Sequence, residues 1–332
     1  MAPAAAPGPA DRVPALCNAT EAQAKRIPLD MIVLVDRSGS MMGELWEQTV
    51  KALTAFFQDP ASAQINIALN FFGPRDENVE GNEICNPVQY NPPQVPGAPP
   101  LLVLPDDAAK LVGELNAPES DPGGTTPMYG ALKGTLQFAT AFQDAHPEHK
   151  VIVVFTSDGE PCCGECEEFN GDPSYEDVDP KIKGLAASAY NYNLVQTYVV
   201  AIEGADVDEL NKIAAAGGTG QVYDVTADIA LFKQKMEEIR SNALGCEYLI
   251  PDPEEGEFDP TKLNVQFTPG GGKPETIPQA GSAQDCGAGQ GWYYDDPLAP
   301  LKIFLCPKTC TKVQSDQEGK ITMLFGCPTE VN

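Results

Sequence analysis

The stretch Met31-Ile-Val-Leu-Val-Asp-Arg-Ser-Gly-Ser40 decides the fold of this chain. Its first five residues are all apolar, and a short run that is apolar on both faces is typical of a central strand in a parallel sheet. Three polar residues, Asp36, Ser38 and Ser40, follow directly. Doubly wound sheets bind ligands at the carboxyl ends of their strands. The stretch therefore predicts a buried strand that ends in a binding loop.

Strand and helix patterns alternate on both sides of this stretch. Further strands are predicted over residues 65–72, 101–104, 151–155, 195–202 and 222–225, and helices over residues 44–58, 106–116, 128–145, 175–193, 206–216 and 228–244. Irregular insertions are predicted over residues 73–105 and 161–174. The alternation predicts an α/β fold, with a doubly wound, mostly parallel, Rossmann-like sheet flanked by helices.

The length of 332 residues is enough for two domains at about 150 residues each. The Ala/Pro-rich residues 1–25 are predicted to be a flexible leader, and residues 26–245 to be the α/β domain. Residues 246–332 contain short β-type runs separated by cysteines, which predicts a small disulfide-rich β module. These runs are residues 263–267, 292–294, 301–305 and 321–325.

The chain has ten cysteines, most of them far apart in the sequence. The one C-x-x-C motif with metal-ligand spacing that we consider, Cys163-Gly-Glu-Cys166, is compatible with zinc, redox chemistry or a disulfide. Disulfides are the main expectation, and they indicate an extracellular or cell-envelope location, either periplasmic or on the outer surface. The N-terminus lacks a signal-peptide pattern, so we expect the signal to be absent from this sequence. No run approaches the ~20 apolar residues of a membrane-spanning helix.

The composition is strongly acidic: 48 acidic against 21 basic residues give a formal net charge of −27. Phosphate groups are bound mainly by lysine and arginine, so this charge argues against nucleic acid and anionic membranes as partners. It is compatible with bound divalent cations.

Two further segments carry oxygen ligands after predicted strands. Thr125 and Thr126 lie in a Gly-rich loop, and Asp158 follows the buried run of residues 151–155. Together with Asp36, Ser38 and Ser40 they form a set without imidazole or thiolate. Such a set suits Mg²⁺ first, with Mn²⁺ or Ca²⁺ as alternatives, and leaves one coordination position open.

The segments VLVDRSGSMMG, GGTTPMYGAL, VVFTSDGEP and GGTGQVYDVT, in this order, resemble the von Willebrand factor type A (vWA) family with its metal-ion-dependent adhesion site. The resemblance covers roughly residues 26–245. It implies that Ser38 and Ser40 bind the ion directly, and that Asp36 and Asp158 do so directly or through water. It also implies a threonine six positions before a buried apolar residue, which favours Thr126 because Leu132 follows it, with Thr125 as the alternative.

By the same resemblance, the open position is completed by an Asp or Glu carboxylate of a protein partner. The expected function is a cation-dependent binding module for adhesion or recognition. The alternatives are a structural or regulatory subunit of an extracellular assembly and a metal-assisted hydrolase. We do not expect the protein to be an enzyme. Ser38 lacks a G-x-S-x-G setting, and His146 and His149 lie at a helix–strand junction far from Asp158.

Each of these residues also has a purely structural interpretation. Asp36 could cap a helix, Thr126 could begin one, and Asp158 with Gly159 could form a turn. The acidic residues in and after the second insertion could bind a second cation, although a solvated acidic rim is the simpler interpretation. These residues are Glu165, Glu167, Glu168, Asp172, Glu176, Asp177 and Asp179.

Overall fold

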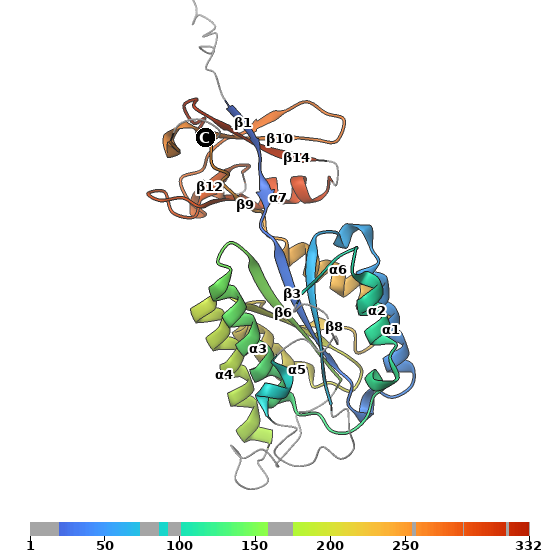
Figure 1. Cartoon of the computed structure of the whole chain (residues 1–332). Helices are drawn as coiled ribbons and strands as arrows, with labels where there is room; N and C mark the ends of the chain where they lie inside the picture. The colour runs from blue at the N-terminus through green and yellow to red at the C-terminus, as the bar shows by residue number, and fades with distance from the viewer. Residues whose placement is uncertain are drawn as a thin grey trace, which may run out of the picture. The chain divides into compact units, whose positions relative to one another are not determined.

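The strand predicted from the deciding stretch, β3 (Leu29–Asp36), lies in the middle of a six-stranded sheet (Figure 1). The structure is a computed structural model. It describes residues 20–73, 86–91, 101–158, 175–253, 257–287, 289–316 and 319–331. The chain divides into two units, which we call the α/β unit (Ile27–Leu244) and the β unit (Met1–Arg26 with Gly245–Asn332).

All strands of the α/β sheet run parallel except one short edge strand. In spatial order they are β5 (Leu102–Val103), β4 (Ile65–Phe72), β3, β6 (Lys150–Ser157), β7 (Gln196–Ala201) and β8 (Tyr223–Asp224). β5 pairs with β4 in the antiparallel direction. Parallel pairing on both sides of β3 places the ends of β3, β4 and β6 at one edge of the sheet.

Helices cover both faces of this sheet (Figure 1). One face carries α1 (Glu44–Phe57), α2 (Ala108–Leu115) and α6 (Phe232–Ala243), and the other carries α3 (Met128–Ala145), α4 (Tyr175–Asn193) and α5 (Val207–Ala216). Alternate residues of β3 point to opposite layers. Met31, Val33 and Val35 pack in the α1 layer, and Ile32 and Leu34 pack in the α3 layer. Burial on both faces explains why β3 is continuously apolar.

The α/β fold class is confirmed, and β4, α3 and α4 have the predicted bounds. Most of the other elements of this unit differ from prediction at their ends. The helix predicted over residues 228–244 is instead a 3-10 turn (Ile229–Leu231) followed by α6. The carboxylate of Asp228 accepts a hydrogen bond from the amide of Ala230, which ties the chain into this turn before the α-helix begins.

The described part of the β unit contains two antiparallel sheets and one α-helix. The first sheet has the order β1 (Thr20–Gln23), β14 (Lys320–Phe325), β10 (Leu263–Thr268) and β11 (Glu275–Ile277). The second has the order β12 (Trp292–Tyr294), β13 (Lys302–Leu305), β9 (Glu247–Leu249) and β2 (Lys25–Arg26). Trp292 is fully buried in the core of this unit, and its indole Nε1 donates to the carbonyl of Ile277 at 3.0 Å.

Several features of the β unit differ from the sequence predictions, including the unpredicted strands β9 and β11. Residues 20–25 were assigned to the flexible leader, but β1 pairs with β14 and β2 pairs with β9. The composition of residues 20–25 does not reveal that they form strands, because such short strands are stabilised by partners from the far end of the chain. The helix α7 (Pro307–Gln314) was missed because it buries only Thr309 and Val313. Residues 1–19 lie outside the described residues.

The predicted disulfides are confirmed within the described part of the chain. Cys246 is bonded to Cys310, and Cys286 to Cys306. Cys327 is also disulfide-bonded. The Cys163–Cys166 motif lies outside the described residues. Among the described helices, none has the length and apolar character needed to cross a bilayer.

We predict that the Cys246–Cys310 bond stabilises the β unit alone. Its sequence separation of 64 corresponds to about 4 kcal/mol in the loop-entropy treatment, against about 3 kcal/mol for the separation of 20 in Cys286–Cys306. The double variant Cys246→Ala/Cys310→Ala should therefore lower the urea midpoint of the β unit more than Cys286→Ala/Cys306→Ala does.

The chain's two tryptophans allow a direct measurement, because Trp292 lies in the β unit and Trp46 in the α/β unit. Fluorescence of Trp292 in a Trp46→Phe background should report the lowered urea midpoint of the β unit. Fluorescence of Trp46 in a Trp292→Phe background should report an unchanged α/β unit. Equal shifts in both backgrounds would contradict the prediction.

Candidate metal centre

Asp36 is the last residue of β3, and its side chain is fully buried. Its Oδ1 accepts a hydrogen bond from the amide of Ser38 at 2.9 Å, and its Oδ2 accepts one from the hydroxyl of Ser157 at 3.0 Å. Its own amide donates to Thr156 Oγ1 at 3.2 Å. These bonds fix the carboxylate and turn the chain after β3 back toward the end of β6.

Hydrogen bonds connect the next three predicted ligands. The hydroxyls of Ser38 and Ser40 share a hydrogen bond at 3.0 Å, and Ser40 Oγ donates to Asp158 Oδ1 at 3.0 Å. Asp158 directly follows β6, so parallel pairing of β3 and β6 brings it to the same edge as Asp36. The structure therefore brings together four of the five predicted ligands.

The loop that carries the predicted threonine is fastened to the serine loop through its backbone. The amide of Gly39 donates to the carbonyl of Gly124 at 3.0 Å, and the amide of Gly123 donates to the carbonyl of Arg37 at 2.8 Å. A Cβ atom at Gly39 would lie 3.3 Å from the Gly124 oxygen, so the close approach favours glycine. Thr125 is exposed and Thr126 is half-buried. The choice between the two threonines stays a prediction.

Burial raises the proton affinity of both carboxylates. Burial, followed by repulsion from Asp158, raises the pKa of Asp36 to about 7. Burial also raises the pKa of Asp158, although the hydrogen bond from Ser40 acts against it. A cation between them would favour the ionised form of both carboxylates.

One oxygen of this group lacks a partner among the described residues. Asp158 Oδ2 is buried and makes no hydrogen bond there, while Oδ1 is bound to Ser40. A buried carboxylate oxygen without a partner is strongly destabilising, so it indicates a missing cation or donor. The surrounding donors are all hard oxygens. The residues present therefore fit Mg²⁺, Mn²⁺ or Ca²⁺.

Sequence reasoning missed the residues that support this group. Thr156 and Ser157 hold Asp36, and they are the last two residues of β6. Gly204, with φ +99°, lies so close that a Cβ atom would be 2.6 Å from the Asp158 carbonyl oxygen. The pattern Thr-Ser-Asp after a buried run was the available signal for the two hydroxyls. Strand register, which decides the contact, cannot be seen in the sequence.

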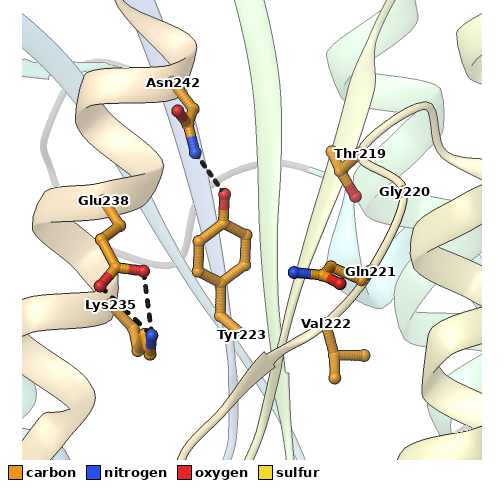
Figure 2. A pocket seen from close by; sticks show the side chains of 8 residues that line it. All are labelled: Thr219, Gly220, Gln221, Val222, Tyr223, Lys235, Glu238 and Asn242. Atoms are coloured by element: carbon orange, nitrogen blue, oxygen red, sulfur yellow. Dashed lines mark hydrogen bonds and ion pairs between the residues drawn. The ribbon is translucent and has the colours of Figure 1, made fainter.

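A pocket of about 520 Å³ lies between α6 and the segment that leads into β8 (Figure 2). Asn242 Nδ2 donates to the Tyr223 hydroxyl at 2.7 Å, and Lys235 forms an ion pair with Glu238 at 3.0 Å. None of the residues that line this pocket is a predicted ligand. The pocket is therefore separate from the candidate metal centre. Of the acidic residues proposed in the sequence analysis as a second cation site, Glu165, Glu167, Glu168 and Asp172 lie outside the described residues, and Glu176, Asp177 and Asp179 belong to α4.

No family model and no curated protein matches the chain. Solved structures do match. The manganese-loaded TRAP protein of Plasmodium vivax is 18% identical, with a TM-score of 0.39, and the match covers 60% of this chain and 66% of that chain. The open conformation of the pilus adhesin SpaC from Lactobacillus rhamnosus GG is 13% identical, with a TM-score of 0.45, over 91% of this chain and 39% of that one.

A third match is the vWF domain of the type V pili tip protein Mfa5 from Porphyromonas gingivalis. It is 11% identical, with a TM-score of 0.42, over 71% of this chain and 99% of that one. At these values the similarities carry no argument about function. The mostly parallel sheet flanked by helices, and the Asp-x-Ser-x-Ser loop hydrogen-bonded to Asp158, match what the sequence resemblance implies. The α/β unit therefore agrees with the fold that the sequence resemblance to the von Willebrand factor type A family implies.

Proposed function

We propose that the chain is a divalent-cation-dependent protein-binding module. The ion is held by Asp36, Ser38, Ser40, Thr126 and Asp158, which we call the metal motif. The observation that carries the proposal is the buried Asp158 Oδ2, which has no hydrogen-bond partner in the described structure although it lies in a group of oxygen donors. Mg²⁺ is the first expectation, with Mn²⁺ and Ca²⁺ as alternatives.

Each residue of the metal motif has a separate role in this proposal. Ser38 and Ser40 present their hydroxyl oxygens to the ion, and Asp36 and Asp158 supply the negative charge, directly or through water. Ser157 and the Ser38 amide already hold the Asp36 carboxylate. The bound ion supplies a positive charge with one open coordination position. That position accepts an Asp or Glu carboxylate of a protein partner.

Because the chain is strongly acidic, binding of a partner's carboxylate depends on the bound ion. A net charge of −27 repels an acidic surface, whereas a bound dication presents a local positive charge to an incoming carboxylate. Disulfides in the β unit support an extracellular or cell-envelope location. We propose no catalysis, because the hydroxyls of Ser38 and Ser40 are hydrogen-bonded to each other and to Asp158 rather than to a histidine base.

The first prediction concerns metal binding itself. Calorimetric titration of Mg²⁺, Mn²⁺ and Ca²⁺ into chelator-treated protein should show saturable binding that is lost in Asp36→Ala and Asp158→Ala. Removal of either carboxylate takes away both a ligand and charge. Asp208→Ala, an exposed acid in the first turn of α5, is the matched control and should bind like the wild type. Unchanged binding in both motif variants would refute the metal centre.

The second prediction distinguishes the two threonines. Thr126→Ala should weaken Mg²⁺ binding at least about tenfold, or about 1.4 kcal/mol, because a direct ligand is lost. Thr125→Ala should leave it unchanged, because Thr125 is exposed. The same titration measures both variants. The opposite ranking would assign the ligand to Thr125.

The third prediction concerns the stability of the metal-free protein. The pKa of Asp36 is raised from 3.8 to about 7, so the folded state binds more protons than the unfolded state between these values. Stability therefore falls as the pH rises through this range. Asp36→Asn removes the buried charge and should make the metal-free protein more stable than wild type at pH 8, by on the order of 1 kcal/mol or more.

Urea unfolding at pH 5 and pH 8, with chelator and with excess Mg²⁺, measures this effect. The advantage of Asp36→Asn should shrink at pH 5, and Mg²⁺ should reverse it by stabilising only the wild type. A variant that is less stable than the wild type at pH 8 in chelator would show that the carboxylate pair is not a source of instability.

A further inference from the structure

The two histidines of the chain lie within one turn, far from the metal motif. His146 follows the last residue of α3, and His149 precedes β6. With Glu148 they form a cluster in which one nitrogen of each ring and one carboxylate oxygen all lie within 4.8 Å of one another. At about 3.3 Å per residue along β6, His149 and Asp158 are roughly 30 Å apart.

The turn is held in place by one side chain. Gln143 Nε2 donates to the carbonyls of His146 and His149, at 3.1 and 3.0 Å, and its Oε1 accepts from the amide of Val151 at 3.0 Å. The amide of His149 also donates to the His146 carbonyl at 3.0 Å. Both histidines are therefore positioned by the folded backbone. A preformed ligand set needs little reorganisation on binding.

Asp30 orients the second histidine from behind. Asp30 lies in β3, is fully buried, and its Oδ2 lies 2.6 Å from His149 Nδ1, while its Oδ1 accepts from Asn66 Nδ2 at 2.6 Å. A carboxylate on Nδ1 places the proton there and leaves the Nε2 lone pair for a metal, the arrangement common behind zinc-binding histidines. That Nε2 lies 3.6 Å from Glu148 Oε1.

We propose that His146, Glu148 and His149 form a second metal site, specific for a borderline transition-metal dication such as Zn²⁺. Two imidazoles and one carboxylate suit Zn²⁺, Ni²⁺, Co²⁺ or Cu²⁺ rather than the hard ions of the metal motif. In tetrahedral zinc sites with bonds of about 2.0–2.1 Å, ligand atoms lie about 3.3 Å apart. The 3.6 Å from Glu148 Oε1 to both His146 Nδ1 and His149 Nε2 is close to that spacing.

The site is accessible to an incoming ion. The side chains of His146 and Glu148 are 42% and 50% exposed, whereas that of His149 is 21% exposed. A water molecule completes the fourth position. A purely structural role for the turn explains the ion pair of His149 with Asp30 and the stacking of His146 on Phe142, with ring centroids 4.4 Å apart. Such a structural role does not require His149 Nε2 to face Glu148 Oε1.

The test is titration of Zn²⁺ into the full chain, treated with chelator and then saturated with Mg²⁺. We expect one saturable binding event that weakens at least tenfold in His146→Ala and Glu148→Gln. Both replaced side chains are half-exposed, so these variants should fold. Asp30→Asn should weaken binding 10–100-fold, as loss of an outer-shell carboxylate does. The exposed Glu330→Gln and the motif variant Asp158→Ala are the controls and should retain Zn²⁺ binding.

A second readout identifies the ligands. Co²⁺ bound in place of Zn²⁺ should give visible d–d bands without a sulfur charge-transfer band, because the proposed ligands contain no thiolate. Wild-type Zn²⁺ affinity in both His146→Ala and Glu148→Gln, or a thiolate spectrum, would assign the ion to other residues and overturn the proposal. Absence of Zn²⁺ binding to the wild type would also overturn it. The Mg²⁺ titrations of the metal motif test the proposed function independently.

Discussion

The fold depends on one strand that must be buried on both faces and still end in a carboxylate. β3 meets the first requirement with apolar residues in two separate helical layers, and it meets the second with Asp36. Burial of a charge next to the apolar core is unfavourable unless nearby groups compensate. The Ser38 amide and the Ser157 hydroxyl compensate in part, and Asp158 adds repulsion. The proposed metal binding and the predicted instability of the metal-free protein therefore arise from the same two side chains.

Much of this arrangement could be predicted from sequence because its signals are local. A buried apolar run that ends in Asp-x-Ser-x-Ser predicts a strand with a loop at the sheet edge, and Asp158 follows another such run. Because parallel strands end at the same edge of a sheet, the sequence alone predicts that Asp36 and Asp158 lie close together. Helix α3 was equally clear, since its apolar spacing persists from Met128 to Ala145.

The missed features depend on register or on pairing between distant segments. Ser157 contacts Asp36 because of the register between β6 and β3. Glycine is favoured at position 204 because a Cβ atom there would come too close to the carbonyl oxygen of Asp158. The histidine turn was recognised as a helix–strand junction, but its contact with Asp30 depends on the register of β3 and β6. The strands β1 and β2 were overlooked for a similar reason, since their partners β14 and β9 are more than 200 residues away.

The pairing of β1 and β2 with strands from the other end of the chain also determines an order of folding. The α/β unit is a continuous segment inserted between two parts of the β unit. During synthesis it is complete before β9 and β14 exist, whereas the β unit can close only after the last strand has emerged. The strands β1 and β2 therefore remain unpaired for most of translation. Pairings over so large a sequence separation form slowly, and until they form, Cys246, Cys286, Cys306 and Cys310 are open to wrong pairing. Production of the native protein should therefore be limited by closure of the β unit and by the oxidation machinery that accompanies it.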